Sequence, residues 1–199
     1  MNFVFLTRCY KYTSNLEIIK NNLKGIFQGS KHTYEHIIAV DLSHGYPKEE
    51  FLALQDSVTQ VILIDSKEKQ DTQLTMGMDT ALSLANVKPD SYVYVLDDDN
   101  LLHPNFLKVC DYIKDFDAVV FKIEGRTNLG NRSIMSIYPV GHIDWANYIT
   151  KYEVMKKLKI YDPVGTRCED GLFFNKLKMN GYKITFIDEI LAFYNKLPR

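Results

Sequence analysis

Apolar residues recur along the chain as short runs that alternate with helical stripes. Runs rich in β-branched and aromatic side chains predict buried strands at residues 3–6, 36–40, 61–64, 92–96 and 118–123. Between these runs, apolar residues spaced three and four positions apart predict helices. Repeated strand and helix units of this kind favour a mainly parallel sheet with helices on both faces.

Start and stop signals accompany the predicted helices. Ser14 and Glu17 form a capping-box pattern ahead of one apolar stripe, and Asp71 can cap a second stripe that reaches Ala85. Pro104 suits the first turn of a third helix. Further helices are predicted at residues 48–55, 151–158 and 169–180.

The alternation loosens after residue 124. Residues 125–141 mix Gly, Asn, Arg and Ser with single apolar residues, which indicates a loop or an antiparallel excursion. Two more apolar runs follow, at residues 184–187 and 191–194. Because no linker or repeat interrupts the chain, we expect one α/β domain over residues 1–199, with a mixed sheet edge and two halves that meet after residue 124.

The composition is that of an ordinary globular protein, with 46% hydrophobic and 25% charged residues among 199. The longest stretch without Lys, Arg, Asp or Glu, residues 133–143, is far shorter than the roughly 18 residues that a membrane span requires. The apolar run at residues 3–6 is also too short for the hydrophobic region of a signal peptide. We therefore expect a cytoplasmic protein without a transmembrane segment.

Cysteine usage and charge exclude several classes of protein. Cys9, Cys110 and Cys168 are widely spaced and form no CxxC pattern, which argues against a disulfide framework or a zinc cluster. All three are expected to be small buried side chains. The net charge is −1, with −5 over residues 1–99 and +4 over residues 100–199, so no strongly basic face for nucleic acid is indicated.

Three consecutive carboxylates, Asp97, Asp98 and Asp99, follow the predicted strand at residues 92–96. Their charges repel one another at close range unless a cation or solvent relieves them. Ligands in open α/β sheets also bind outside the carboxyl ends of the strands. The triplet therefore favours a site for Mg²⁺ or Mn²⁺, ions that one or two carboxylates commonly share with substrate phosphates.

Other interpretations of the aspartate triplet fit less well. An EF-hand loop starting at Asp97 would need Gly and Glu where Leu102 and Lys108 stand. A phosphatase of the haloacid dehalogenase type would resemble DxDxT or DxDxV after the first strand, whereas Asp97, Asp99 and Leu101 follow the fourth. A solvated acidic turn is the simplest alternative, but the preceding buried strand favours a functional role.

A second acidic pair, Glu169 and Asp170, stands at the start of the last predicted helix. Carboxylates in the first turn of a helix are stabilised by the helix dipole, so capping alone explains one of them. The combination of this pair with an earlier metal-type cluster suits chemistry on a phosphate leaving group that also needs a general base. Asp170 is the candidate for that base.

A family resemblance emerges from these motifs taken in order. The segment 92–107, YVYVLDDDNLLHPNFL, resembles the strand, DxD turn and following helix of GT-A glycosyltransferases, particularly those of family 2. The segment GMDTA at 77–81 resembles the helix that precedes that strand in the family. Later landmarks follow in the same order: GHIDWAN at 141–147, EDG at 169–171, GYKI at 181–184 and LAFY at 191–194.

The resemblance implies a nucleotide-diphospho-sugar donor, bound mainly by residues 1–124, and a cofactor that is Mn²⁺ or Mg²⁺. Asp99 would coordinate the metal, and Asp97 would lie near both the metal and the donor ribose, with Asp98 beside it in the donor site. Thr7 and Asp41, at the ends of the first two strands, would lie near the nucleobase.

The resemblance also implies that residues 125–199 form the acceptor and catalytic half. Asp170, with Glu169 next to it, would take the proton from the acceptor hydroxyl. One base on the acceptor side predicts that the transferred sugar inverts its configuration. The acceptor itself is open: a saccharide, a lipid-linked sugar, a protein or a modified nucleic-acid base all fit the sequence.

The chain departs from the family pattern at two places. Leu74 and Thr75 stand where the family commonly carries Arg-Asn ahead of the helix glycine, so some donor contacts are absent or moved. No histidine follows His142, so a late histidine ligand for the metal is lacking. Either metal binding would then be weaker, or water would complete the metal's coordination.

Several other side chains have two interpretations each. Trp145 could stack on a sugar face or belong to the core, and Asp144 could orient sugar hydroxyls or cap the next helix. His142 could approach the diphosphate or be an ordinary hydrogen-bonded histidine. A modest basic surface and three loop arginines could bind phosphates or be solvated: Lys151, Lys156, Lys157, Lys159, Arg126, Arg132 and Arg167.

Two other functions compete with glycosyl transfer. The first is a sugar-nucleotide or glycan-binding module that kept the fold and lost turnover, which the departures at Leu74 and Thr75 favour. The second is a nucleotidyltransferase on a related fold. Against the second stands the absence of a glycine-rich segment after the first strand, where the sequence has Thr7, Arg8, Cys9 and Tyr10.

Overall fold

The computed structural model describes residues 1–9, 13–42, 45, 47–64, 70–127, 130–134, 143–160 and 169–198. Their side chains are described as well, except those of residues 70–76, 126, 127, 130–134 and 169. Nine described strands form one sheet in the order β3-β2-β1-β4-β8-β6-β9-β5, and β7 pairs with β6 outside this path. In the described part of the chain, no helix has the length and apolar character needed to cross a bilayer.

The first half of the chain builds the parallel part of the sheet. Strands β1 (Asn2–Cys9), β2 (Thr33–Asp41), β3 (Thr59–Ile64) and β4 (Tyr92–Val95) all run parallel, with β1 at the centre of this group. The carboxyl ends of these strands therefore meet at one edge. The aspartate triplet follows β4 at that edge, as the sequence predicts.

The second half adds a mixed part. Strand β8 (Tyr148–Lys151) lies antiparallel between β4 and β6 (Ala118–Thr127). Strand β9 (Ile184–Tyr194) runs parallel to β6, and the short β5 (Leu101–Leu102) and β7 (Gly130–Ile134) pair antiparallel with β9 and β6. The expected meeting point of the two halves, after residue 124, falls inside β6.

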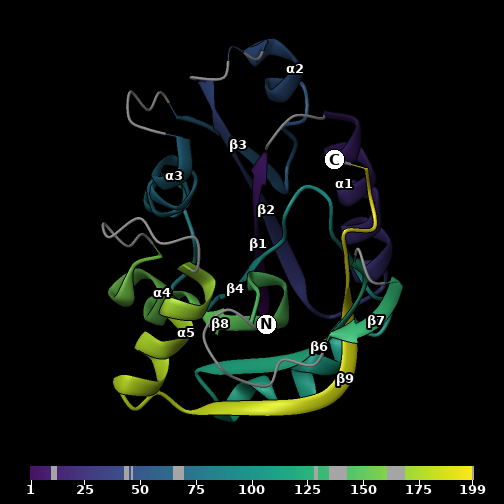
Figure 1. Ribbon diagram of the computed structural model, residues 1–199. Coiled ribbons are helices and arrows are strands. Elements are labelled where there is room, and N and C mark those ends of the chain that lie inside the picture. The colour runs from purple at the N-terminus through teal and green to yellow at the C-terminus, as the bar shows by residue number, and fades with distance from the viewer. Residues whose placement is uncertain are drawn as a thin grey trace.

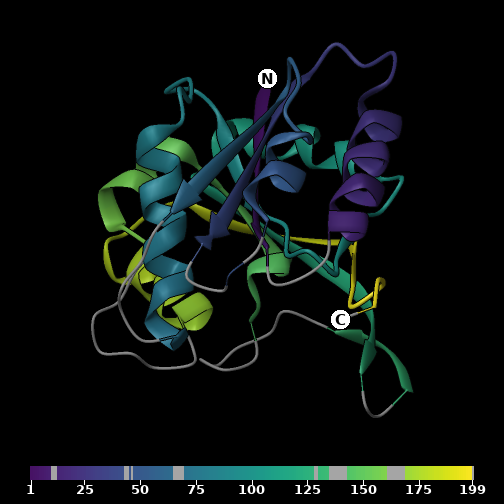
Figure 2. The same ribbon diagram turned by 90° about the horizontal axis from the view of Figure 1, so that it is seen from above.

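Helices cover both faces of the sheet. Helices α3 (Gln70–Leu84), α4 (Tyr152–Leu158) and α5 (Glu169–Met179) pack on one face, and α1 (Thr13–Phe27) packs on the other (Figure 1). The view from above shows α3 and α1 on opposite sides of the parallel strands (Figure 2). The short α2 (Lys48–Leu52) buries Phe51 against the ends of β2 and β3.

An aromatic cluster fixes the strand that leads into the aspartates. Phe106 lies 5.8 Å from Phe3, 5.5 Å from Phe5 and 5.7 Å from Tyr94 between ring centroids. Aromatic pairs of this kind contribute about 0.5–1.5 kcal/mol each beyond the area that they bury. Beneath the site, β4 is thus held by rings from both its neighbouring strand and the segment after the turn.

The structure confirms the α/β class, the five predicted strands, and an antiparallel return at Gly130–Ile134. It corrects three details. The segment after Pro104 forms two 3₁₀ helices, Phe106–Asp111 and Ile113–Asp115, instead of an α-helix. The runs at 184–187 and 191–194 join into β9 across an irregularity in register, and β8 was not predicted.

Candidate active site

The aspartate turn is anchored by backbone hydrogen bonds at the carboxyl edge of the sheet. The amide of Leu96 donates to the carbonyl of Leu6, and the amide of Asn100 closes the turn on the carbonyl of Asp97 at 3.0 Å. All three aspartates are buried, with Asp99 at 1% exposure. Three carboxylates held away from bulk solvent need positive partners or protons close by.

Arg8 supplies one positive partner. Its Nε and Nη2 donate to the two carboxylate oxygens of Asp97 at 2.7 and 2.9 Å. The parallel register that pairs Leu6 of β1 with Val95 of β4 carries Arg8 level with Asp97. Sequence reasoning missed Arg8 as a site residue, although a charged side chain at the end of a buried central strand is the signal that indicates it.

Asp144 lies in the same site, although 47 residues separate it from Asp97 in the chain. It caps the 3₁₀ helix Trp145–Asn147: its Oδ1 accepts from the Ala146 amide at 2.9 Å, and its own amide donates to Asn147 Oδ1 at 2.9 Å. Burial raises the pKa of Asp144 to about 7, and the nearby charges of Asp97 and Asp170 add to the rise. The Ala146 amide and Arg8 oppose that rise.

Asp170 stands in the first turn of α5 and is partly exposed. Its Oδ1 accepts from the Gly171 amide at 2.7 Å, and its carbonyl accepts from the Tyr148 hydroxyl at 3.1 Å. The charges of Asp97 and Asp170 both act on Asp144, so the two carboxylates lie within electrostatic range of it. The first turn of a helix favours anions, which suits a carboxylate at this position.

Two buried tyrosines donate hydrogen bonds to the backbone near Asp144 and at Asp170. The Tyr94 hydroxyl donates to the Ala146 carbonyl at 2.8 Å, and the Tyr148 hydroxyl reaches the first turn of α5. Burial raises the pKa of both phenols well above their usual value, and the neighbouring aspartates add to the rise. Both hydroxyls therefore stay protonated and act as fixed hydrogen-bond donors.

The carboxyl-terminal residues pass over the aspartate turn. The Leu197 amide donates to the Asp99 carbonyl at 2.9 Å, and the Asn195 amide donates to Asn100 Oδ1 at 2.8 Å. Asn15 of α1 then donates to the carbonyl of Pro198 at 2.8 Å. These residues hold the turn in place, which nothing in the sequence pattern indicates.

Two predicted donor contacts have different surroundings from those expected, and a third stands at the predicted place. Thr7 lies two residues before the end of β1, is fully buried and shares a 2.9 Å hydrogen bond with His36 Nε2, so its hydroxyl does not face the open edge. Trp145 is 4% exposed and packs on Tyr148 and Phe173, which makes it a core residue instead of a sugar platform. Asp41 does end β2, as predicted, and is 7% exposed.

Several other predictions fall outside the described residues or side chains: those for Leu74, Thr75, Arg126, Arg132, His142, Arg167, Cys168 and Glu169. Cys9 and Cys110 are buried thiols, as predicted. In the basic surface, Lys151 pairs with Asp117 at 2.9 Å, whereas Lys156, Lys157 and Lys159 are exposed. Three of the four lysines in this surface are therefore exposed to solvent, on helix α4 and just after its end.

Carboxylate oxygens are the candidate metal ligands that the described residues place at the aspartate turn. In the described part of the chain, no three His, Cys, Asp or Glu side chains are grouped to hold a metal ion. Mg²⁺ commonly takes one or two carboxylates and completes its shell with phosphates and water. The carboxylates of Asp97 and Asp99 offer the oxygen donors that such a shared ion uses.

Comparison with solved structures identifies the architecture as the GT-A fold. A mannosyltransferase from Pyrobaculum calidifontis, solved with GDP-Man and Mn²⁺, is 13% identical and has a TM-score of 0.64 over 97% of this chain and 56% of its own. The catalytic domain of Drosophila beta1,4-galactosyltransferase 7, solved with xylobiose, is 12% identical with a TM-score of 0.59 over 95% and 66%. This chain therefore spans less than two thirds of both glycosyltransferase chains.

The same fold also carries nucleotidyl transfer. An inositol-1-phosphate CTP transferase from T. maritima is 13% identical, with a TM-score of 0.55 over 98% of this chain and 89% of its own. No protein-family model and no curated protein matches the sequence. At these identities the likeness establishes the fold, and the chemistry has to be argued from the site.

Proposed function

We propose that this protein transfers a sugar from a nucleotide-diphosphate donor to an acceptor hydroxyl. The observation that carries the proposal is the buried aspartate turn, with Arg8 bound to Asp97, at the carboxyl ends of the parallel strands of a GT-A sheet. Asp144 lies within electrostatic range of both Asp97 and Asp170. The solved neighbours with GDP-Man and Mn²⁺, and with UDP-Gal and manganese, support such a donor.

On the donor side, the aspartate turn would receive the ribose and the diphosphate. Asp97 and Asp98 would contact the donor, Asp41 at the end of β2 would lie toward the nucleobase, and Arg8 would keep Asp97 oriented. Asp97 and Asp99 would hold a divalent ion, Mn²⁺ or Mg²⁺, which would neutralise the charge that develops on the diphosphate as it leaves. The burial of the three aspartates supports this role, because it would limit the access of water to the leaving group.

On the acceptor side, Asp170 would act as the general base, with Glu169 beside it in the first turn of α5. An acceptor oxygen forms a bond to the anomeric carbon while the bond from that carbon to the diphosphate oxygen breaks. The electron pair leaves with the diphosphate, and the hydroxyl proton passes to the carboxylate of Asp170. Attack opposite to the leaving group inverts the configuration of the sugar.

Asp144 would position the sugar between these two sides. Its pKa near 7 leaves a substantial protonated fraction at neutral pH, so its carboxyl can donate a hydrogen bond as well as accept one. A sugar hydroxyl needs both kinds of partner. Protonation of Asp144 also removes one negative charge from the surroundings of the donor diphosphate.

Nucleotidyl transfer is the second candidate, because a CTP transferase shares the fold over most of its own length. In that reaction a sugar or polyol phosphate would attack the α-phosphate of a nucleoside triphosphate and release pyrophosphate. Thr7, Arg8 and Cys9 at the end of β1 do not supply the glycine-rich backbone expected of such an enzyme. We therefore place it second.

The test is turnover of UDP-, GDP-, CMP- and dTDP-sugars by the purified protein with Mn²⁺. We expect nucleoside diphosphate, or CMP from the CMP-sugar, to be released by the wild type, and Asp99→Ala and Asp170→Asn to lower the rate by at least about a hundredfold. Asp170→Asn should still bind the donor, and Asp90→Asn, at an exposed loop position, is the matched control. Pyrophosphate release from a nucleoside triphosphate, or donor binding without turnover, would favour the competing functions.

A further inference from the structure

A second concave site lies at the opposite edge of the sheet from the aspartates. It is a cavity of about 370 Å³, within the range of about 300–1,000 Å³ that small-molecule sites occupy. Its lining comes from the beginnings of β1, β2 and β3 and from the segment between α3 and β4. Since β1 has eight residues at about 3.3 Å each, roughly 25 Å of sheet separates the two edges.

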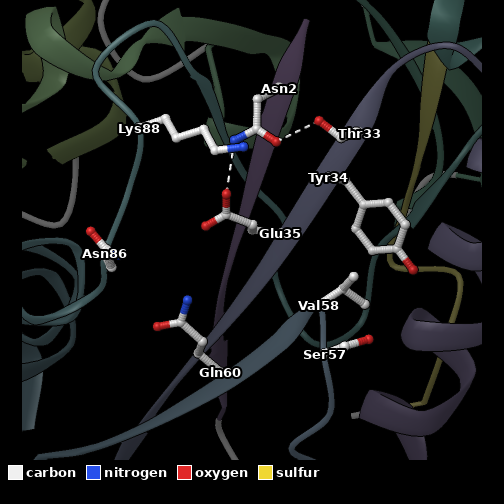
Figure 3. A pocket seen from close by; sticks show the side chains of 9 residues that line it. All are labelled: Asn2, Thr33, Tyr34, Glu35, Ser57, Val58, Gln60, Asn86 and Lys88. Atoms are coloured by element: carbon white, nitrogen blue, oxygen red, sulfur yellow. Dashed lines mark hydrogen bonds between the residues drawn. The ribbon is translucent and has the colours of Figure 1, made fainter.

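A buried asparagine forms the fixed floor of this cavity. Asn2 is 6% exposed as a residue. Its Nδ2 donates to Glu35 Oε1 at 3.0 Å and to Ser91 Oγ at 2.9 Å. Its Oδ1 accepts from the Thr33 hydroxyl at 2.8 Å. Both amide protons of Asn2 are therefore in use, and the carboxylate of Glu35 is held in one orientation at the cavity (Figure 3).

The walls present polar groups that the described protein does not use. Side chains of Gln60, Asn86, Lys88 and Ser57 line the cavity and make no hydrogen bond or ion pair with another described residue. Figure 3 shows Glu35, Gln60, Asn86 and Lys88 arranged around the same space. Side-chain amides and hydroxyls each offer donors and acceptors, so the walls can pair with a ligand that has both.

The charge of the lining argues against divalent cations and phosphates as ligands of this cavity. Glu35 and Lys88 are the two ionised side chains among the nine lining residues, so the cavity has no net charge. One carboxylate is too few for a divalent cation, and one ammonium beside a carboxylate is a poor phosphate site. Tyr34 and Val58 also belong to the lining, but the Tyr34 ring packs on Phe27 at 4.9 Å between ring centroids, so the polar side chains set the chemistry of the ligand.

We propose that this cavity binds a neutral saccharide of one or two rings, through Glu35, Gln60, Asn86 and Lys88. Each sugar hydroxyl donates and accepts hydrogen bonds, as these side chains do. The site is separate from the aspartate edge, and the proposal does not require sugar transfer to occur there. A saccharide bound here would attach the protein to a glycan without occupying the site at the aspartates.

The experiment is an amide NMR titration of the isotopically labelled full chain with a panel of neutral mono- and disaccharides. The panel holds glucose, galactose, mannose, xylose, N-acetylglucosamine and their disaccharides, and inorganic phosphate serves as the comparison ligand. At least one saccharide should give saturable shifts at residues 33–35, 57–60 and 86–88. Gln60→Ala and Asn86→Ala should each weaken that binding by at least about fivefold, since each removes hydrogen bonds to the ligand.

Two controls separate this proposal from the proposed transfer reaction. Asn105→Ala removes an exposed asparagine outside the cavity and should leave the affinity unchanged. Asp170→Asn should abolish transfer yet keep the shifts at the cavity. Retained spectral dispersion shows that each variant folds, and Lys88→Gln offers another variant at an exposed position.

The proposal fails if no saccharide shifts these residues, or if shifts occur only around Asp97, Asp144 and Asp170. It also fails if phosphate shifts the cavity residues as strongly as the saccharides do. Unchanged affinity in both Gln60→Ala and Asn86→Ala would equally overturn it. None of these outcomes depends on whether the protein turns over a nucleotide sugar.

Discussion

At the scale of single residues, one arginine accounts for the burial of the first of three consecutive aspartates. Asp97 has both carboxylate oxygens paired with Arg8, with side-chain exposures of 8% and 15% for the two residues. Charge repulsion within the triplet is therefore relieved partly by the protein itself. Under the proposed function, a divalent ion shared with the donor diphosphate would add to this relief.

Arg8→Gln should lower the free energy of unfolding by about 2–4 kcal/mol, because it leaves a buried carboxylate without its cation. It should also weaken donor binding, since Asp97 loses its fixed orientation. Urea denaturation and calorimetry with the donor are the measurements. Lys108→Gln is the matched control: it breaks a more exposed pair with Glu189, at 48% and 33% exposure, and should cost at most about 1 kcal/mol. Equal losses in both variants would contradict the role given to Arg8.

Asp144 should make stability depend on pH. Its pKa is about 7 in the folded protein against 3.8 for the ordinary group, so between these values the native state binds more protons than the unfolded state. Stability then falls as pH rises from about 4 to 7. Asp144→Asn keeps an oxygen for the Ala146 amide but cannot ionise, so its stability relative to the wild type should increase by about 3 kcal/mol across this range.

Chemical denaturation of both proteins at several pH values measures that difference. Groups common to the two proteins cancel in the comparison. His36, whose pKa burial lowers to about 3, has the opposite effect, but it is present in both. A difference that stays flat from pH 4 to 8 would show that Asp144 titrates normally.

At the scale of elements, the aspartate turn is held between three segments that are distant in sequence. Strand β4 leads into it, the 3₁₀ helix capped by Asp144 stands beside it, and residues 195–198 cross it. The contact between Leu197 and Asp99 is a hydrogen bond between backbone atoms. It therefore depends on an amide proton and not on the type of side chain.

Leu197→Pro should disrupt the turn more than Leu197→Ala does. Proline lacks the amide that donates to the Asp99 carbonyl, whereas alanine keeps it and loses only side-chain packing. The loss of that buried bond should cost about 1–3 kcal/mol and should weaken donor binding about tenfold beyond the alanine variant. Thermal unfolding and donor calorimetry on both variants test this. Identical donor affinities would show that the terminal residues do not position the turn.

At the scale of the whole molecule, parallel strands separate two kinds of site. Their carboxyl ends collect the acidic groups, and their amino ends collect the neutral polar side chains around Asn2 and Glu35. The sheet between them is a packed core on both faces. A ligand that binds only the folded state at either edge therefore stabilises the entire domain.

A matching donor with Mn²⁺ should raise the melting temperature by about 5–10 °C when its concentration is about a hundred times its dissociation constant. The shift should require the metal and disappear in Asp99→Ala, while Asp90→Asn should retain it. A thermal-shift panel of nucleotide sugars and nucleoside triphosphates makes the measurement. A shift with triphosphates alone would favour nucleotidyl transfer.

The sequence predicted features that depend on neighbours in the chain. The apolar runs of β1 to β4, the helix stripe carrying Leu16, Ile19 and Leu23, and the aspartate triplet after a buried strand were all visible. Strand β8 was not, because Tyr148–Lys151 becomes a strand only through pairing with β4 and β6. The 3₁₀ form of the segment Phe106–Asp111 likewise reflects packing of Phe106 into the aromatic cluster.

What the sequence determined by itself was the α/β frame and the carboxyl edge as the place for chemistry, since alternating local patterns fix strands, helices and their order. The tertiary structure decided which side chains share that edge. It paired Arg8 with Asp97, brought Asp144 within electrostatic range of Asp97 and Asp170, and packed Trp145 into the core. Those outcomes follow from strand register and burial, which are properties of contacts between distant segments and leave no periodic signal along the chain.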